Sequence, residues 1–139
     1  MNPTFHKIPG EFFIRIEGSF ESAHYLYSYF PDGSDEPIHG HSWQVELFIA
    51  AKNAGCSDNG ISFDFLDLKI ELYQCLEKID HCLINQLEDF KNVNPTAENI
   101  ARWFYNKLLS VADKKKGVIK EIRVHEGPHA YASFIPFSS

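Results

Sequence analysis

The position of the helical periodicity is the feature that most limits how this chain can fold. Two central segments carry apolar residues at intervals of three and four, a spacing that places side chains on one face of a helix. The segments on either side alternate instead between apolar and polar residues, as half-buried strands do. The apolar helical positions are Leu68, Leu72, Leu76 and Ile79 in the first segment, and Ile100, Trp103, Phe104 and Leu108 in the second.

Strand-like segments flank the two helices in pairs. Residues 11–17 and 41–52 precede the helices, and residues 118–124 and 130–137 follow them. The order β-β-α-α-β-β therefore predicts an α+β fold, in which two helices cover one face of an antiparallel sheet. We expect one domain over residues 1–139, because a chain of this length suits a single core.

Polar residues at the expected helix starts support this reading. Asp64 is a candidate N-cap of the first helix, with Asp67 in the first turn, where the helix dipole favours a carboxylate. Thr96 is the candidate N-cap of the second helix, after Asn94 and Pro95. The apolar run at residues 61–65 predicts one further short strand just before the first helix.

Composition excludes several classes of protein. Hydrophobic residues make up 44% of the 139 residues, enough for a core without disulfides or a structural metal. The net charge is −6 and the one basic run is residues 114–116, so no nucleic-acid partner is expected. No stretch approaches the length of a membrane span, and residues 1–17 lack the apolar core of a secretory signal. We therefore expect no membrane partner and a cytoplasmic location.

Three histidines form a candidate metal site. His39 and His41 are two apart at the start of a predicted strand, so both imidazoles can point to one side. His24 can face them if the first two strands pair as a hairpin. Three histidines with an open fourth position describe a catalytic zinc site, although imidazole also suits other first-row metals. The alternative is that His39 and His41 are simply polar strand residues.

Two further acidic positions have both a structural and a functional interpretation. Asp80 and His81 follow the first helix, either as a polar helix end or as a carboxylate–imidazole pair that transfers protons near neutral pH. Glu126 follows the strand at residues 118–124. It is either an exposed strand end or a carboxylate that accepts two parallel N–H bonds from a planar ring.

Six motifs in order resemble the 6-pyruvoyltetrahydropterin synthase / 6-carboxytetrahydropterin synthase family. They cover most of the chain from residue 20 to residue 128, and each is modest alone. The motifs are FESAHYL, IHGHSWQVEL, ISFDFLDLK, IDHCLIN, NPTAENIA and IRVHEGP.

The resemblance implies the tunnelling fold, whose β-β-α-α-β-β subunits join sheet to sheet into barrels, commonly trimers that stack into hexamers. It implies a homo-oligomer that acts on a small pterin substrate, 7,8-dihydroneopterin triphosphate. The resemblance implies that His24, His39 and His41 bind zinc. It also implies that Asp80 and His81 form the proton-relay pair and that Glu126 is the carboxylate that anchors the pterin.

The chain departs from the family pattern at two places. Most members have a catalytic cysteine four residues before the first histidine of HGH, where this chain has Asp35. Glu36 comes one residue later, which resembles a variant branch where glutamate replaces the cysteine and the side chain is cleaved toward 6-hydroxymethyldihydropterin, a folate precursor. Gly127 stands where Thr or Ser usually follows the anchoring glutamate.

Three hypotheses follow from these departures. The first is a zinc-dependent pterin lyase with a pyruvoyl, carboxy or hydroxymethyl product, in which Glu36 is the extra base and Asp35 the competing candidate. The second is a catalytically silent paralogue that binds pterin and zinc. The third is a structural α+β domain with incidental histidines, which the ordered motifs disfavour.

Overall fold

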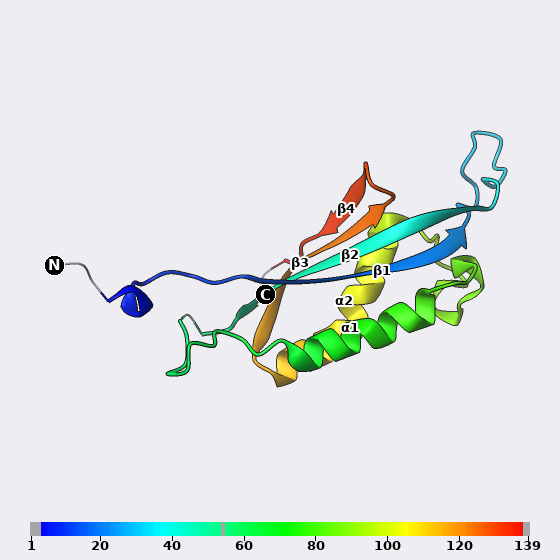
Figure 1. Ribbon diagram of the computed structural model, residues 1–139. Helices are drawn as coiled ribbons and strands as arrows, with labels where there is room; N and C mark the ends of the chain where they lie inside the picture. Colours follow the sequence, from blue (N-terminus) through cyan, green and yellow to red (C-terminus); the bar gives the residue numbers. More distant parts are fainter. Residues whose placement is uncertain (1–3, 54, 138–139) are drawn as a thin grey trace.

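The computed structural model describes residues 4–53 and 55–137. It contains one four-stranded antiparallel sheet in the order β1-β2-β3-β4, with two helices packed against the same face (Figure 1). This confirms the predicted fold class. The strands are β1 (Ile14–His24), β2 (His39–Ala51), β3 (Gly117–Glu126) and β4 (Tyr131–Phe134); the helices are α1 (Leu66–Ile79) and α2 (Ala97–Lys114); short 3-10 turns are η1 (Phe5–Lys7), η2 (Ile84–Gln86) and η3 (Glu88–Phe90).

The strand predictions were correct in position and partly wrong in extent. β1 begins at Ile14 rather than at residue 11 and continues to His24, and β4 is shorter than the predicted 130–137. The prediction of a strand at residues 61–65 is wrong. Ile61 and Phe65 of this segment are 45% and 42% exposed, so its apolar residues do not form a strand face packed on the core. Its Phe63 is buried instead and packs where β3 begins, beside Gly117.

The helix starts show one predicted cap and one shifted cap. The Thr96 side chain accepts a hydrogen bond from the Asn99 backbone N–H at 3.1 Å, as expected for an N-cap. Asp64 lies one residue before the cap position of α1, and its carboxylate accepts from the Leu66 N–H at 3.1 Å. Each side chain therefore satisfies a backbone donor that the helix leaves unpaired.

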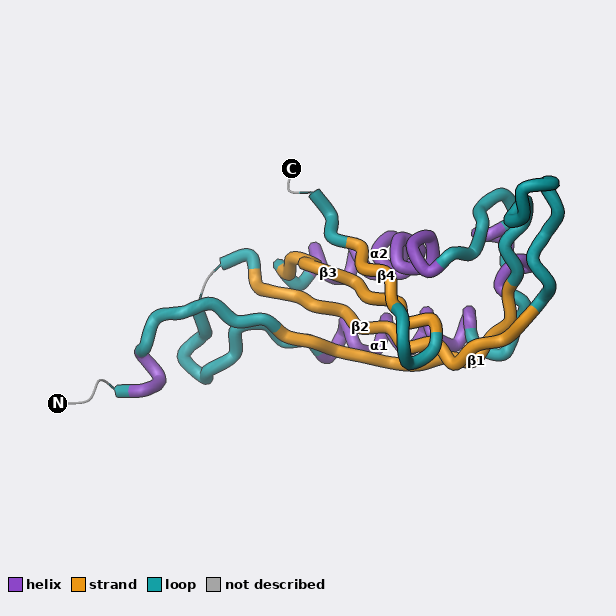
Figure 2. Tube along the Cα trace, turned by 90° about the horizontal axis from the view of Figure 1, so that it is seen from above, coloured by secondary structure: helices purple, strands orange, loops and turns teal. Residues whose placement is uncertain are grey.

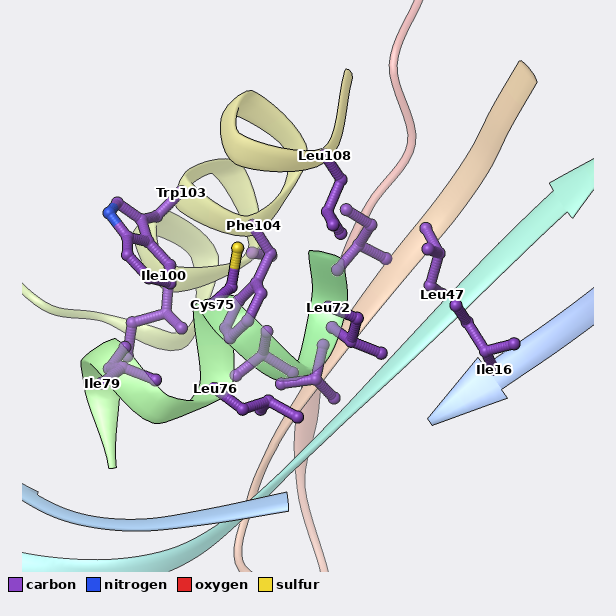
Figure 3. Packing of buried hydrophobic residues seen from close by; sticks show 14 of the residues in the cluster. Ile16, Leu47, Leu72, Cys75, Leu76, Ile79, Ile100, Trp103, Phe104 and Leu108 are labelled. Carbon is purple, nitrogen blue, oxygen red and sulfur yellow. The ribbon is translucent and has the colours of Figure 1, made fainter. Parts of the chain in front are cut away.

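The core lies between the two helices and the sheet, as Figure 3 shows for residues of α1, α2, β1 and β2. All eight predicted helical core positions are buried. α1 packs closely on Gly18 of β1, where an added Cβ would lie 2.3 Å from Leu76 Cδ1. A larger residue at this position would force the end of the Leu76 side chain to move.

The opposite face of the sheet carries charged side chains. Glu46 on β2 is 7% exposed, and its carboxylate bonds both Arg15 from β1 and His125 from β3. Arg123 lies over the rings of Phe48 and Tyr131, 4.6 and 5.2 Å from their centroids. We call the group Arg15, Glu46 and His125 the open-face network.

Two connections meet at one end of the sheet. Residues 25–38 join β1 to β2, and residues 80–96 join α1 to α2; both lie at the end where β1 finishes and β2 begins (Figures 1 and 2). A backbone bridge between Ala23 and Leu83 ties the second connection to β1. In the described part of the chain, neither helix is both long and apolar enough to cross a membrane.

Candidate metal centre and active site

Strand pairing brings three histidines and one glutamate to a single point. His24 lies directly opposite His39 in the β1–β2 register, and Glu126 lies opposite Trp43 in the β2–β3 register. Residues opposite each other in a ladder share a face, and so do residues two apart, which adds His41 to the group. One ligand atom from each of the four lies within 4.8 Å of the others, and we call this group the histidine cluster: His24, His39, His41 and Glu126.

Aromatic side chains form the floor of the histidine cluster. The rings of His24 and His41 meet the Trp43 indole edge-on, at centroid distances of 4.9 and 5.2 Å. Trp43 in turn stacks on Phe20 at 5.6 Å, and its Nε1 donates to the Ser22 carbonyl. The cluster therefore rests on the end of the hydrophobic core, which restricts how its rings can turn.

Backbone carbonyls orient two of the imidazoles. His24 Nδ1 lies 2.7 Å from the Pro95 carbonyl, and His39 Nδ1 lies 2.8 Å from the Pro37 carbonyl. A carbonyl only accepts, so each Nδ1 carries a proton, and Nε2 is the nitrogen of each ring that can bind a metal. The two Nε2 atoms are 3.2 Å apart. Metal-binding histidines commonly have this outer hydrogen bond, which fixes both the tautomer and the ring orientation.

His41 supplies the observation that tests whether a metal fits. Its Nε2 is buried and, among the described residues, makes no hydrogen bond of acceptable geometry, although Glu126 Oε1 lies 2.9 Å away. Burial lowers the pKa of His41, and the neighbouring His24 and His39 lower it further, against an opposing effect of Glu126. The ring is thus kept neutral, which is the form that binds a metal. A buried neutral nitrogen without a well-formed hydrogen bond, next to a carboxylate and to two nitrogens whose rings are oriented by carbonyls, fits a cation with a preference for nitrogen ligands.

Glu126 lies closer to the histidines than its predicted role requires. Its Oε1 is 2.9 Å from His41 Nε2 and 3.3 Å from His24 Nε2. The carboxylate thus stands where a fourth ligand would stand, and its side chain is 35% exposed on the outer side. This position is compatible with a metal ligand and with a carboxylate that meets a substrate next to the metal.

The structure separates the two acidic candidates for the missing cysteine. Glu36 Oε1 lies 3.7 Å from His39 Nε2 and accepts a hydrogen bond from the Leu26 N–H at 3.2 Å. Asp35 is exposed, and its carboxylate accepts from the Ser28 N–H at 2.9 Å. Glu36 therefore joins the edge of the histidine cluster, whereas Asp35 serves the turn of the loop.

Asp80 and His81 form a pair that does not belong to the histidine cluster. His81 Nδ1 is 2.8 Å from Asp80 Oδ2, and Asp80 Oδ1 accepts from the Glu21 N–H at 2.8 Å. The bond from Glu21, together with the bond to His81, lowers the pKa of Asp80. The His81 side chain is 78% exposed, and its backbone adopts a left-handed φ of 52°. Within the described residues, no hydrogen bond or ion pair joins this pair to the cluster.

Comparison with known proteins then assigns the chain. The sequence profile described as 6-pyruvoyl tetrahydropterin synthase matches residues 13–136. The chain belongs to this family. Membership of the 6-pyruvoyl tetrahydropterin synthase family places it among pterin lyases and confirms the family predicted from the sequence motifs.

Two archaeal relatives carry different names within the family. A protein of Archaeoglobus fulgidus, provisionally named 6-carboxy-5,6,7,8-tetrahydropterin synthase, is 32% identical over 123 residues, covering 88% of this chain and 94% of the relative. The dihydroneopterin monophosphate aldolase of Pyrococcus furiosus is 33% identical over 95 residues, covering 68% of this chain and 73% of the relative.

Solved structures of family members share the fold. The 6-pyruvoyl tetrahydropterin synthase of Caenorhabditis elegans superposes with a TM-score of 0.77 at 23% identity, covering 93% of this chain and 98% of that one. A Plasmodium vivax synthase with a catalytic glutamate replaced by alanine superposes with a TM-score of 0.66 at 20% identity, covering 90% of this chain and 97% of that one.

Sequence reasoning missed the groups that hold this family site in place. The Pro37 and Pro95 carbonyls orient two histidines, and backbone acceptors leave no side-chain signal in a sequence. Asn85 and Asn94 bind the loop that carries Glu36, although both residues stand inside quoted motifs. A motif shows that a residue belongs to the pattern but not which partner it binds.

Proposed function

We propose that this chain is a zinc-dependent pterin lyase that acts on 7,8-dihydroneopterin triphosphate. The observation that carries the proposal is the convergence of three imidazole Nε2 atoms and one carboxylate oxygen, all within 4.8 Å of one another, in a member of a pterin lyase family. His24, His39 and His41 would hold the zinc. When bound, zinc supplies Lewis-acid polarisation of the side-chain hydroxyl groups of the substrate.

Glu36 is the proposed base of the reaction. It lies beside His39, so it can accept a proton from a substrate hydroxyl placed at the cluster. A single N–H bond from Leu26 holds the carboxylate and leaves its remaining lone pairs for the substrate. Positioned acid–base groups typically contribute about 100- to 10,000-fold to a rate. Glu126 would orient the pterin ring through paired N–H bonds, next to the metal-facing side chain.

Glu36 favours one product as a second, more specific candidate. Loss of a proton from the hydroxyl two carbons from the ring breaks the adjacent C–C bond, releases an aldehyde and leaves a carbanion next to the ring. Protonation of that carbon gives 6-hydroxymethyl-7,8-dihydropterin, as folate synthesis requires. The Pyrococcus furiosus relative named an aldolase and the Plasmodium vivax synthase with a catalytic glutamate support this route. The pyruvoyl and carboxy products remain the family alternatives.

We further propose that the active site is completed by a second subunit. The Asp80–His81 pair is proposed to move a proton at the neighbouring carbon, yet His81 faces outward and is 78% exposed. The free edges of β1 and β4 in this open sheet also need covering. A homo-oligomer, trimer or hexamer, would bring a pair from one copy to the cluster of another. Sedimentation at micromolar concentration tests this, and a fully active monomer would contradict it.

Product analysis tests the proposed reaction. Zinc-loaded protein is incubated with 7,8-dihydroneopterin triphosphate and, in parallel, with the monophosphate, and the pterin products are identified by mass spectrometry. Pyruvoyl, carboxy or hydroxymethyl pterin identifies the branch. Unchanged substrate, with pterin binding intact by calorimetry, would contradict the lyase proposal and indicate a silent paralogue.

Glu36→Gln tests the base directly, with Asp35→Asn as the matched control. We expect Glu36→Gln to lose about 100-fold or more in kcat while zinc content and pterin affinity stay unchanged. Asp35→Asn retains the oxygen that accepts from Ser28, so its turnover should equal that of the parent protein. Normal turnover of Glu36→Gln would remove Glu36 from the mechanism and return attention to Asp35.

A further inference from the structure

We propose that Asn85 and Asn94 are positioning residues that fix Glu36 against the histidine cluster. The proposal rests on the proposed function, because it matters for turnover only if Glu36 takes part in the reaction. After β1 ends at His24, residues 25–27 leave the sheet, and Tyr27 begins a turn. The backbone groups of Tyr25 and Tyr27 are paired by the side chains of two asparagines rather than by a strand.

Each asparagine binds both backbone groups of one residue. Asn85 Oδ1 accepts from the Tyr25 N–H at 3.0 Å, and its Nδ2 donates to the Tyr25 carbonyl at 2.8 Å. Asn94 repeats the arrangement two residues on, accepting from the Tyr27 N–H at 3.0 Å and donating to its carbonyl at 3.2 Å. A carboxamide offers one acceptor and two donors, so each side chain imitates the edge of a neighbouring strand.

The residue between the two tyrosines binds Glu36. Leu26 has its backbone groups on the other side of the segment: its carbonyl accepts from the Glu36 N–H at 2.9 Å, and its N–H donates to Glu36 Oε1 at 3.2 Å. Both the backbone and the carboxylate of Glu36 are therefore fixed to Leu26. The two asparagines hold Leu26 from either side, so they determine where Glu36 stands.

The same scaffold also holds a predicted metal ligand. Pro95, next to Asn94, provides the carbonyl that orients His24, and the Asn94 carbonyl accepts from Asn99 Nδ2 at 3.0 Å in the first turn of α2. The Ala23 N–H donates to the Cys82 carbonyl at 2.9 Å, which fixes the start of the connection at residues 80–96 beside β1. The same set of hydrogen bonds thus positions Glu36 and His24. It fixes the distance between these two residues, although no direct bond joins them.

A structural clamp and a positioning clamp predict different kinetics. A clamp that only stabilises the loop would lower thermal stability and affect turnover equally whether or not Glu36 is present. A clamp that acts through Glu36 affects kcat only while Glu36 can accept a proton. A displacement of about 1 Å in a catalytic group costs up to roughly 100-fold in rate, so the effect is measurable.

The experiment is a double-mutant cycle between the asparagines and Glu36. Asn85→Ala and Asn94→Ala are each made in the parent and in Glu36→Gln, with Asn85→Asp and Asn94→Asp as milder variants that keep the accepting oxygen. Asn106→Ala is the matched control, because Asn106 lies exposed on α2. Turnover of 7,8-dihydroneopterin triphosphate is followed with enzyme in excess, so that slow variants give a rate, and zinc content and Tm are recorded for each protein.

We expect each alanine variant to lower kcat by about 10- to 100-fold with KM and zinc content unchanged, and the aspartate variants to fall between. In Glu36→Gln the same replacements should change the rate little, because interacting residues are not additive. An equal loss in both backgrounds, or no loss in the parent, would overturn the positioning role while leaving Glu36 as the base. No effect of Glu36→Gln itself would instead overturn the proposed base, and the positioning role with it.

Discussion

Two groups of histidine and glutamate lie on opposite faces of the same pair of strands. The histidine cluster uses His41 of β2 and Glu126 of β3 on the helix side, and the open-face network uses Glu46 of β2 and His125 of β3 on the other. His125 and Glu126 are even neighbours in sequence. Composition therefore does not distinguish the two groups, and their hydrogen bonding does.

The polar groups of the open-face network are bonded to one another, whereas the histidine cluster contains a nitrogen without a well-formed hydrogen bond. Burial raises the pKa of Glu46, but bonds from Arg15 and His125 outweigh it, so the net pKa is lowered and the carboxylate stays charged and paired. In the histidine cluster, by contrast, His41 Nε2 is buried and, among the described residues, makes no hydrogen bond of acceptable geometry, although Glu126 Oε1 lies 2.9 Å away. Buried polar atoms without a well-formed hydrogen bond are rare in folded proteins, so this nitrogen points to a ligand.

Replacing a histidine in each group should give the largest contrast. We expect His39→Ala or His41→Ala to weaken zinc binding by more than the roughly 10- to 100-fold that loss of an outer hydrogen-bond partner costs. His125→Ala should leave zinc binding unchanged, because its ring is bonded to Glu46 on the other face. Metal analysis and competition with a chelator measure both, and full zinc retention in His39→Ala and His41→Ala would refute the metal site.

Replacing Glu126 of the histidine cluster should weaken pterin binding, whereas replacing Glu46 of the open-face network should not. The expected factor is smaller than that for zinc binding above. Charge-assisted bonds lost in Glu126→Ala cost about 1.5–3 kcal/mol, or roughly 10- to 150-fold in affinity, and zinc should stay bound. Glu46→Gln should bind the pterin like the parent protein. Calorimetry with 7,8-dihydroneopterin and zinc-loaded protein compares them. If Glu126→Ala loses zinc as well, the carboxylate is a fourth ligand, and unchanged pterin affinity would remove it from the ring site.

The smallest effect should be a change in stability confined to the open-face network. Glu46→Gln removes a charge bonded by Arg15 and His125, which should cost about 1–3 kcal/mol of unfolding free energy at neutral pH. The pKa of Glu46 is lowered on folding, so this contribution is complete above its ordinary value of 4.5 and is lost as pH falls through the folded value. Urea unfolding at pH 7 and below pH 4 should show the difference shrinking, whereas a constant difference would exclude the charge as its cause.

Sequence patterns predicted most of the fold because the apolar periodicity survives into the structure. The helical positions such as Leu72 and Phe104 are buried, and Thr96 caps α2. The strand predicted at residues 61–65 was wrong because only Phe63 of its three apolar residues is buried. A short apolar pattern does not show whether a segment pairs with a neighbouring strand.

The residues of the site were predictable where their spacing along a strand determines their geometry. They were not predictable where the geometry depends on the path of a loop. His39 and His41 converge because they are two apart on one strand, and His24 joins them through the hairpin register. The choice between Asp35 and Glu36 depended on which carboxylate the turn uses for Ser28. That the Asp80–His81 pair is not bonded to the cluster within the described residues was likewise not predictable, because it depends on how α1 ends against β1.

The close approach at Gly18 has a consequence for inherited variation in this enzyme. Leu76 lies in the last turn of α1, just before the helix ends at Asp80 and His81. A side chain at position 18 would force the buried end of Leu76 into another position, one turn before the proposed proton-relay pair. Such an allele would act through packing below that pair, with zinc still bound, although the altered residue lies outside the site.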